Sequence, residues 1–107
     1  MKTLFIDDLE LKIGSNQLEN QVLIDKMEDK HTWFHIDNLP SAHLTIPVSF
    51  ENLKKKDIHR IALELKKNSK YKKYNSISVI YTHRDSLKLT NTPGKVFITG
   101  KKQSIKV

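Results

Sequence analysis

The stretch that decides the fold is TWFHIDNLPSAHLTI, residues 32–46. Its first six residues alternate with a period of two, so that Trp33, His35 and Asp37 share one face and the apolar residues between them share the other. This pattern is typical of a half-buried β-strand with its apolar face toward the core. The stretch also holds the only tryptophan and two of the five histidines of the chain, so it is the first place to look for chemistry.

A turn is predicted at Asn38–Ser41, before a second strand over Ala42–Val48. Pro40 has no backbone N–H to donate to a neighbouring strand and its ring fixes φ, so the chain is expected to reverse here. In a hairpin centred on this turn, His35 lies opposite His43. A register shifted by one residue would instead send one of the two imidazoles to the opposite face.

Two strands and a helix are predicted before the hairpin. Residues 3–6 and 9–13 are predicted as two short strands, and in the second of them Leu9, Leu11 and Ile13 alternate with polar residues. Asn16 followed by Glu19 has the spacing of a capping box, and an apolar stripe of about three turns continues from there. This helix is expected to end near Asp29.

A longer helix and further strands are predicted after the hairpin. The apolar stripe of the helix has the spacing i, i+3, i+4 and i+7: Ile58, Ile61, Ala62 and Leu65. A strand at Ile77–Tyr81, an irregular basic segment at Tyr81–Lys88 and a terminal hairpin of Lys95–Thr99 with Ser104–Val107 are expected to follow. The predicted fold class is therefore α+β, a mainly antiparallel sheet with two helices on one side, in a single domain over residues 1–107.

The net charge of +7 is unevenly distributed along the chain. Residues 1–53 carry four lysines and nine acidic side chains, whereas residues 54–73 carry nine basic and two acidic ones, and residues 74–107 carry six and one. Clustered Lys and Arg bind phosphates and release counterions, so this asymmetry favours a polyanion-binding face. A solvated helix surface is the alternative explanation.

Composition excludes several classes of site. The chain has no cysteine, which rules out disulfides, iron–sulfur clusters and thiolate zinc sites and agrees with a reducing environment. The apolar run at Thr3–Ile6 is too short for a signal peptide or a membrane span, so a soluble protein of the cytoplasm, or also of the nucleus, is expected. Neither a Walker loop nor a G-x-G-x-x-G motif occurs, and no cofactor is expected.

Two segments resemble a known family. The motif WFH at residues 33–35, followed by PSAH at residues 40–43, resembles the W-F-H…P-G-S-H signature of the NFACT-R domain family, and is more similar to its stand-alone branch. GSNQLEN at residues 14–20 resembles the family's G-K-N-N-x-Q-N segment and keeps Asn16 and Asn20. The resemblance implies binding to structured RNA, tRNA or rRNA, in a ribosome-linked role such as ribosome-associated quality control.

On this interpretation the site combines the hairpin with the basic segment. Trp33 would stack on a base, His35 and His43 would donate to phosphates or base edges, and the cations would supply an electrostatic track. The residues predicted to bind RNA are Trp33, His35, Asp37, His43, Asn16, Asn20, Lys56, Arg60, Lys66, Lys67, Lys70, Lys72, Lys73 and Arg84.

Structural roles for these residues stay open. Asn16 and Asn20 would equally well cap and order the helix, and Trp33 with the two hairpin histidines could form a satisfied, partly buried cluster. Tyr71 and Tyr74 could stack bases or pack against the helix, and packing is favoured for at least one of them.

Alternative functions also stay open. The H-x-D pattern at His35 and Asp37 is found in non-haem iron sites, but 107 residues hardly supply the large scaffold that such sites need, and no metal is expected. A protein-interaction module on the ribosome, or an RNA-modification enzyme or its accessory subunit, are the alternatives to RNA binding. A protein that is not an enzyme is favoured.

Overall fold

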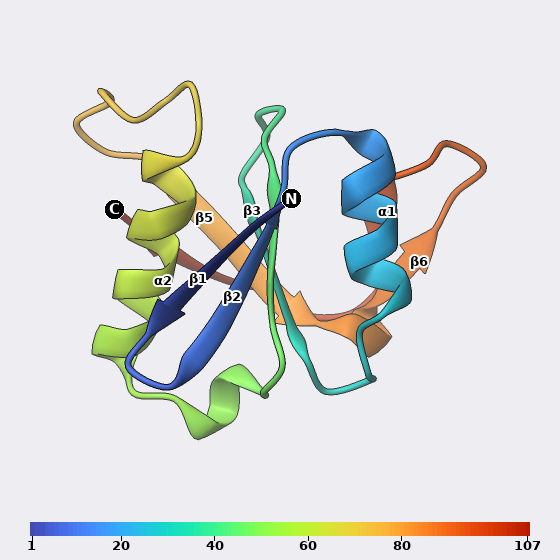
Figure 1. Cartoon of the computed structure of the whole chain (residues 1–107), viewed down its shortest axis with the longest axis horizontal. Coiled ribbons are helices and arrows are strands. Elements are labelled where there is room, and N and C mark those ends of the chain that lie inside the picture. Colours follow the sequence, from blue (N-terminus) through green and yellow to red (C-terminus); the bar gives the residue numbers. More distant parts are fainter.

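A six-stranded antiparallel sheet crosses the middle of the molecule (Figure 1). The computed structural model describes residues 1–107. The strand order is β1-β2-β4-β3-β5-β8, and every neighbouring pair is antiparallel. The strands of this large sheet are β1 (Lys2–Ile6), β2 (Leu9–Gly14), β3 (Thr32–Ile36), β4 (His43–Ile46), β5 (Ser78–His83) and β8 (Gln103–Lys106).

Two helices and a second, two-stranded sheet cover the large sheet. These elements are α1 (Gln17–Asp25), α2 (Lys55–Lys67), β6 (Leu87–Leu89) and β7 (Val96–Ile98), with short 3-10 turns η1 (Phe50–Asn52) and η2 (Arg84–Ser86). In Figure 1, α2 lies on the left of the large sheet, and α1 with β6 lies on the right. No helix has the length and apolar character needed to span a bilayer.

The alternation in β3 divides the core into two parts. Phe34 and Ile36 belong to a cluster of 13 buried residues that includes the apolar stripe of α2. Trp33 points to the other face, where it packs with Ile24 of α1, and with Ile80 and Leu87. The predicted α+β class is confirmed, but the prediction that both helices lie on one side is wrong. The polar residues of β3 suggested a face open to solvent, whereas α1 and the small sheet cover part of it.

The predicted hairpin has the expected register. β3 pairs with β4 so that Phe34 lies opposite Leu44, and the same register brings His35 opposite His43, with ring centroids 5.1 Å apart. Asn38 in the turn has φ of +59°, a left-handed conformation that asparagine tolerates better than most residues.

Two boundary predictions are wrong. Helix α1 ends at Asp25 instead of near Asp29, because the backbone N–H of Met27 bonds back to Ile24 O (3.1 Å) and Met27 then packs beside the smaller cluster. Five of the eight residues in the segment predicted as irregular, Tyr81–Lys88, lie in strands β5 and β6.

The predicted terminal hairpin is not formed. β7 pairs with β6, and β8 pairs with β5, so the two segments belong to different sheets. The link between them crosses from one sheet to the other, and Thr82 Oγ1–H of β5 donates to Lys101 O (2.9 Å) along it. Ile98 packs with the smaller cluster and Ile105 with the larger one, so each segment follows its own part of the core.

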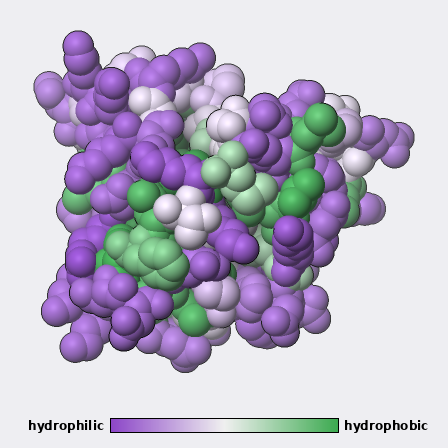
Figure 2. Space-filling model, in the orientation of Figure 1, coloured by the Kyte–Doolittle hydropathy of each residue, from purple (hydrophilic) through white to green (hydrophobic).

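The surface seen in Figure 2 is largely hydrophilic. Hydrophobic residues gather over β1 and on the outer side of α1 in this view. The exposed apolar side chains of these two elements include Phe5 (64% exposed), Leu18 (71%) and Val22 (40%).

Candidate nucleic-acid interface

Three rings from β3 and β4 form a compact group, here called the aromatic cluster: Trp33, His35 and His43. The rings of Trp33 and His35 are stacked, with centroids 5.4 Å apart and an interplanar angle of 12°. His43 is edge-on to both, at 84°, with centroid distances of 5.4 Å to Trp33 and 5.1 Å to His35. Trp33 Nε1–H donates to His43 Nδ1 over 3.0 Å, which fixes the cluster internally.

Trp33 is the buried member of the aromatic cluster, and almost none of its surface is exposed. Only 3% of the residue is exposed, because Ile24, Ile80 and Leu87 pack around it and His35 is stacked on its ring. The prediction that Trp33 stacks directly on a base is therefore wrong. An indole buried with a hydrogen-bond partner is the usual arrangement in a core, and here it holds the two histidines in place.

Both histidines are neutral near pH 7. Burial lowers the pKa of His35, although its bond to Ile36 O and the nearby Asp37 act in the opposite direction. Burial, followed by the proximity of His35, lowers the pKa of His43 to about 3. The cluster therefore offers uncharged imidazoles to a ligand.

The two asparagines order the site from the helix. Asn16 is the N-cap of α1, and its side-chain oxygen accepts from Glu19 N over 2.9 Å. Asn20 is buried, and its Oδ1 accepts from the backbone N–H of His43 over 3.2 Å. A Cβ on Gly14 would lie 2.3 Å from that same oxygen, so only glycine allows this close approach. These contacts support the structural alternative for both asparagines.

The aromatic cluster forms one wall of a cleft of about 750 Å³. Strand β7 and the turn before it form the other wall, where Phe97 is 59% exposed. The charged residues that line the cleft are Asp37, Lys95 and Lys102. The small sheet is held beside α1 because Gly94 N–H donates to Gln21 Oε1 over 2.9 Å.

Phe97, Lys95 and Lys102 were not among the residues predicted from the sequence. Phe97 lies between Val96 and Ile98, which pack with the smaller cluster, so strand alternation puts the phenylalanine on the outer face. An aromatic residue on the polar face of a strand, beside a lysine, is a signal that the sequence carried. The cleft itself depends on the pairing of β7 with β6, which was not predicted.

Three of the predicted basic residues are engaged within the protein. Lys66 is 9% exposed and its Nζ donates to Val107 O (3.1 Å), so its ammonium group is engaged within the protein and not free for RNA. Arg84 donates to the carbonyls of Ile24 and Leu87, at 3.2 and 3.1 Å, and thereby ties α1 to β6. Arg60 forms ion pairs with carboxylates, the nearest being that of Asp7 at 3.3 Å.

The other predicted lysines are exposed, at two ends of α2. Lys56 lies in its first turn, whereas Lys67, Lys70, Lys72 and Lys73 lie at its end and in the loop beyond. Lys70 and Lys2 line a second hollow of about 310 Å³, which shares Pro40 and Ser41 with the large cleft. Cations therefore line hollows on both sides of the β3–β4 turn.

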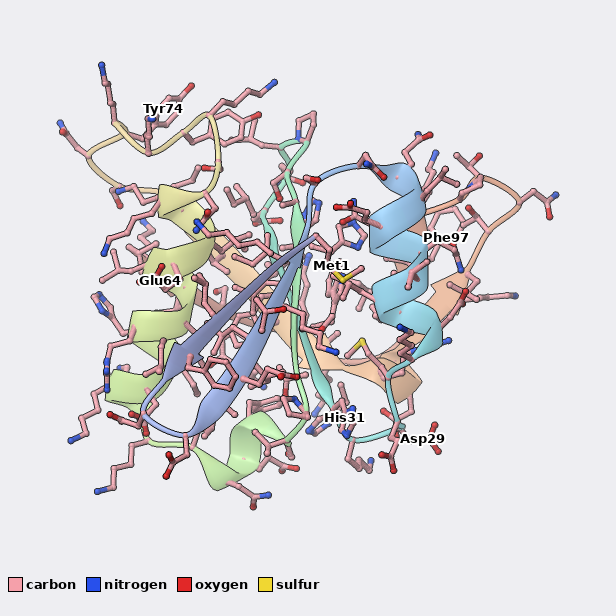
Figure 3. All side chains as sticks on the ribbon, in the orientation of Figure 1. Met1, Asp29, His31, Glu64, Tyr74 and Phe97 are labelled. Atoms are coloured by element: carbon pink, nitrogen blue, oxygen red, sulfur yellow. The ribbon has the colours of Figure 1, made fainter.

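The two tyrosines of this loop differ, and the prediction that at least one of them packs is confirmed. Tyr71 is 6% exposed within the larger cluster, and Tyr74 is 53% exposed. Figure 3 shows Tyr74 on the loop after α2 and Phe97 beside α1, at opposite sides of the view, with the β3–β4 turn between them. No group of three His, Asp or Glu side chains is arranged to hold a metal ion.

Comparison with known proteins agrees with this arrangement. No curated protein matches the chain. The structure is similar to that of the C-terminal part of the fibronectin/fibrinogen-binding protein from Streptococcus suis, with a TM-score of 0.85 and 23% sequence identity. The match covers 98% of this chain and 43% of that one, and at this identity it shows a shared fold. Residues 6–104 match the family model described as the NFACT protein RNA binding domain, and the chain therefore belongs to the NFACT-R family.

Proposed function

We propose that this chain binds an unpaired segment of a structured RNA, tRNA or rRNA, in a ribosome-linked role in the cytoplasm. The observation that carries the proposal is the large cleft, which is lined by His35 and by the exposed residue Phe97 together with Lys95 and Lys102. Aromatic faces beside cations are what an unstacked nucleotide requires, since bases stack on rings while phosphates meet Lys and Arg.

The second hollow supports a binding path for RNA that is longer than one nucleotide. Lys2 and Lys70 line it, and it adjoins the cleft across the β3–β4 turn. A strand that crosses this turn would place phosphates near cations on both sides while a base occupies the cleft. The excess of basic residues after residue 53 adds a general attraction for RNA.

The experiment that tests this proposal compares two exposed phenylalanines. Phe97→Ala should weaken binding of single-stranded RNA by about 1 to 3 kcal/mol, because it removes a stacking surface. Phe5→Ala is the matched control, since Phe5 is 64% exposed on β1 and does not line the cleft. Affinity is measured by fluorescence anisotropy and folding by thermal melting.

Two outcomes decide whether the cleft is the RNA-binding site. Loss of affinity in Phe97→Ala alone, with both variants melting like the parent, supports the cleft as the RNA site. Equal affinities in all three proteins would exclude it. Cosedimentation of the chain with ribosomes, and competition by bulk tRNA, would then identify the class of RNA.

A further inference from the structure

The hydrogen bond from Trp33 fixes the proton of His43. An indole N–H can only donate, so Nδ1 of His43, which lies 3.0 Å from it, must carry a lone pair. Since the ring is neutral, its proton is on Nε2. His43 therefore presents a hydrogen-bond donor at Nε2.

His35 is fixed in the opposite tautomer. Its Nδ1 lies 2.6 Å from the backbone oxygen of Ile36, and a carbonyl oxygen can only accept. Nδ1 therefore carries the proton, and Nε2 of His35 presents a lone pair. The stacked and edge-on contacts within the aromatic cluster hold both rings in these positions.

Both Nε2 atoms are free to meet a ligand. His35 and His43 line the large cleft, and neither Nε2 atom has a hydrogen-bond partner in the protein. No fully buried side-chain nitrogen or oxygen in the structure lacks a partner, so each of these two atoms keeps some contact with solvent, although His43 as a residue is only 5% exposed. The cleft thus contains one neutral donor and one neutral acceptor whose rings are 5.1 Å apart.

We propose that Nε2–H of His43 and Nε2 of His35 form a donor–acceptor pair that reads the edge of one unpaired nucleobase, and not a phosphate. The inference deepens the proposed function and rests on it. A phosphate offers only acceptor oxygens and a negative charge, which the lone pair of His35 would repel. The edge of every base instead places donor and acceptor groups side by side.

The charged residues around the histidine pair suit a site in which the histidines bind the base edge and the lysines bind the RNA phosphates. The charged groups that face the pair are Asp37 at the end of β3, Lys95 before β7 and Lys102 before β8, whereas α1 contributes the neutral Gln17 and Asn20. The two lysines are the phosphate ligands on this interpretation. The depressed histidine pKa values agree with a pair that stays neutral when RNA binds.

The tautomers are tested in the free protein by long-range ¹H–¹⁵N NMR correlations of the imidazoles near pH 7. The expected result is a proton on Nδ1 of His35 and on Nε2 of His43. In Trp33→Phe, which keeps an aromatic ring but has no N–H, His43 should lose its single tautomer. The same tautomer on both histidines of the parent protein would overturn the proposal.

Base reading is tested with two single-stranded RNAs of one length, one natural and one whose bases are apolar isosteres that stack but have no polar edge. The parent protein should bind the isostere RNA about tenfold or more weakly, the value of a good pair of base-edge bonds. His43→Phe should bind the two RNAs alike. His59→Ala, an exposed histidine on α2, should behave like the parent.

The outcomes separate this inference from the proposed function. Equal binding of the two RNAs by the parent protein, with affinity rising as the pH falls from about 7.5 to 6, would mean that imidazolium meets phosphate, and would overturn the pair alone. Binding of neither RNA would overturn both the pair and the proposed function.

Discussion

At the scale of single residues, Phe34 and His43 are both buried but contribute differently to stability. Phe34 is fully buried in the larger cluster, so Phe34→Ala should cost about 3 to 5 kcal/mol of unfolding free energy. His43→Ala should cost about 1 to 3 kcal/mol, mainly because it leaves Trp33 Nε1–H buried without an acceptor. Urea unfolding of both variants measures the difference. A His43→Ala protein as stable as the parent would mean that this hydrogen bond contributes nothing.

The neutral histidines also predict how stability depends on pH. The folded-state pKa of His43 is about 3, and that of His35 is lowered, whereas an unfolded histidine titrates near 6.5. The unfolded chain therefore binds more protons below pH 6.5, and the unfolding free energy falls as the pH is lowered. We expect a slope of up to about 1.4 kcal/mol per pH unit for each histidine.

This slope is measured by urea unfolding between about pH 7 and 5, above the range in which most carboxylates titrate. His43→Gln should remove one histidine's share of it. An unchanged slope in that variant would show that His43 titrates normally in the folded protein.

The residue types alone predicted which side chains of β3 share a face, because strand alternation is a local property of the backbone. They could not predict that Lys66 and Arg84 are engaged inside the protein. Each of these is satisfied by a partner distant in the sequence: Val107 and Ile24 respectively. Long amphipathic side chains are exposed or buried according to the carbonyls within their reach, and composition does not reveal these.

At the scale of elements, the two ends of α2 should differ in their effect on RNA binding. Lys70→Gln, Lys72→Gln and Lys73→Gln together change exposed side chains of the loop beside the second hollow. They should lower the slope of log affinity against log salt by about 0.7 to 0.9 for each phosphate that the loop no longer neutralises. The control is Lys55→Gln, in the first turn of the helix, which should leave the slope unchanged. Equal slopes in the two variants and the parent would remove the loop from the interface.

Local signals predicted elements well where the partners are neighbours in sequence. The β3–β4 hairpin and the apolar stripe of α2 follow from turn chemistry and periodicity within one segment. The pairing of β6 with β7 and of β5 with β8 depends on which part of the core receives Ile98 and Ile105. The same dependence kept the cleft out of reach of sequence reasoning, although strand alternation already marked Phe97 as an exposed aromatic residue.

At the scale of the whole molecule, the large sheet separates a stabilising face from a binding face. Ile61→Ala, on α2, should cost about 2 to 5 kcal/mol of stability and leave RNA affinity unchanged when it is measured well below the melting temperature. Leu87→Ala truncates the smaller cluster that seats β6 and β7, so it should lower affinity as well as stability. Melting curves and binding isotherms of the two proteins test this. If Ile61→Ala and Leu87→Ala lost RNA affinity to the same extent, packing on the α2 face of the sheet would also influence binding on the other face.

The small sheet is joined to the large one without any shared strand pairing. Side-chain packing around Trp33, the clamp of Arg84 and the single bond from Gly94 to Gln21 hold it in place. The walls of the cleft can therefore separate without breaking a backbone hydrogen bond of either ladder. Such separation would expose apolar surface around Trp33, so the tolerance of the site for bases of different width should depend on how tightly the smaller cluster packs.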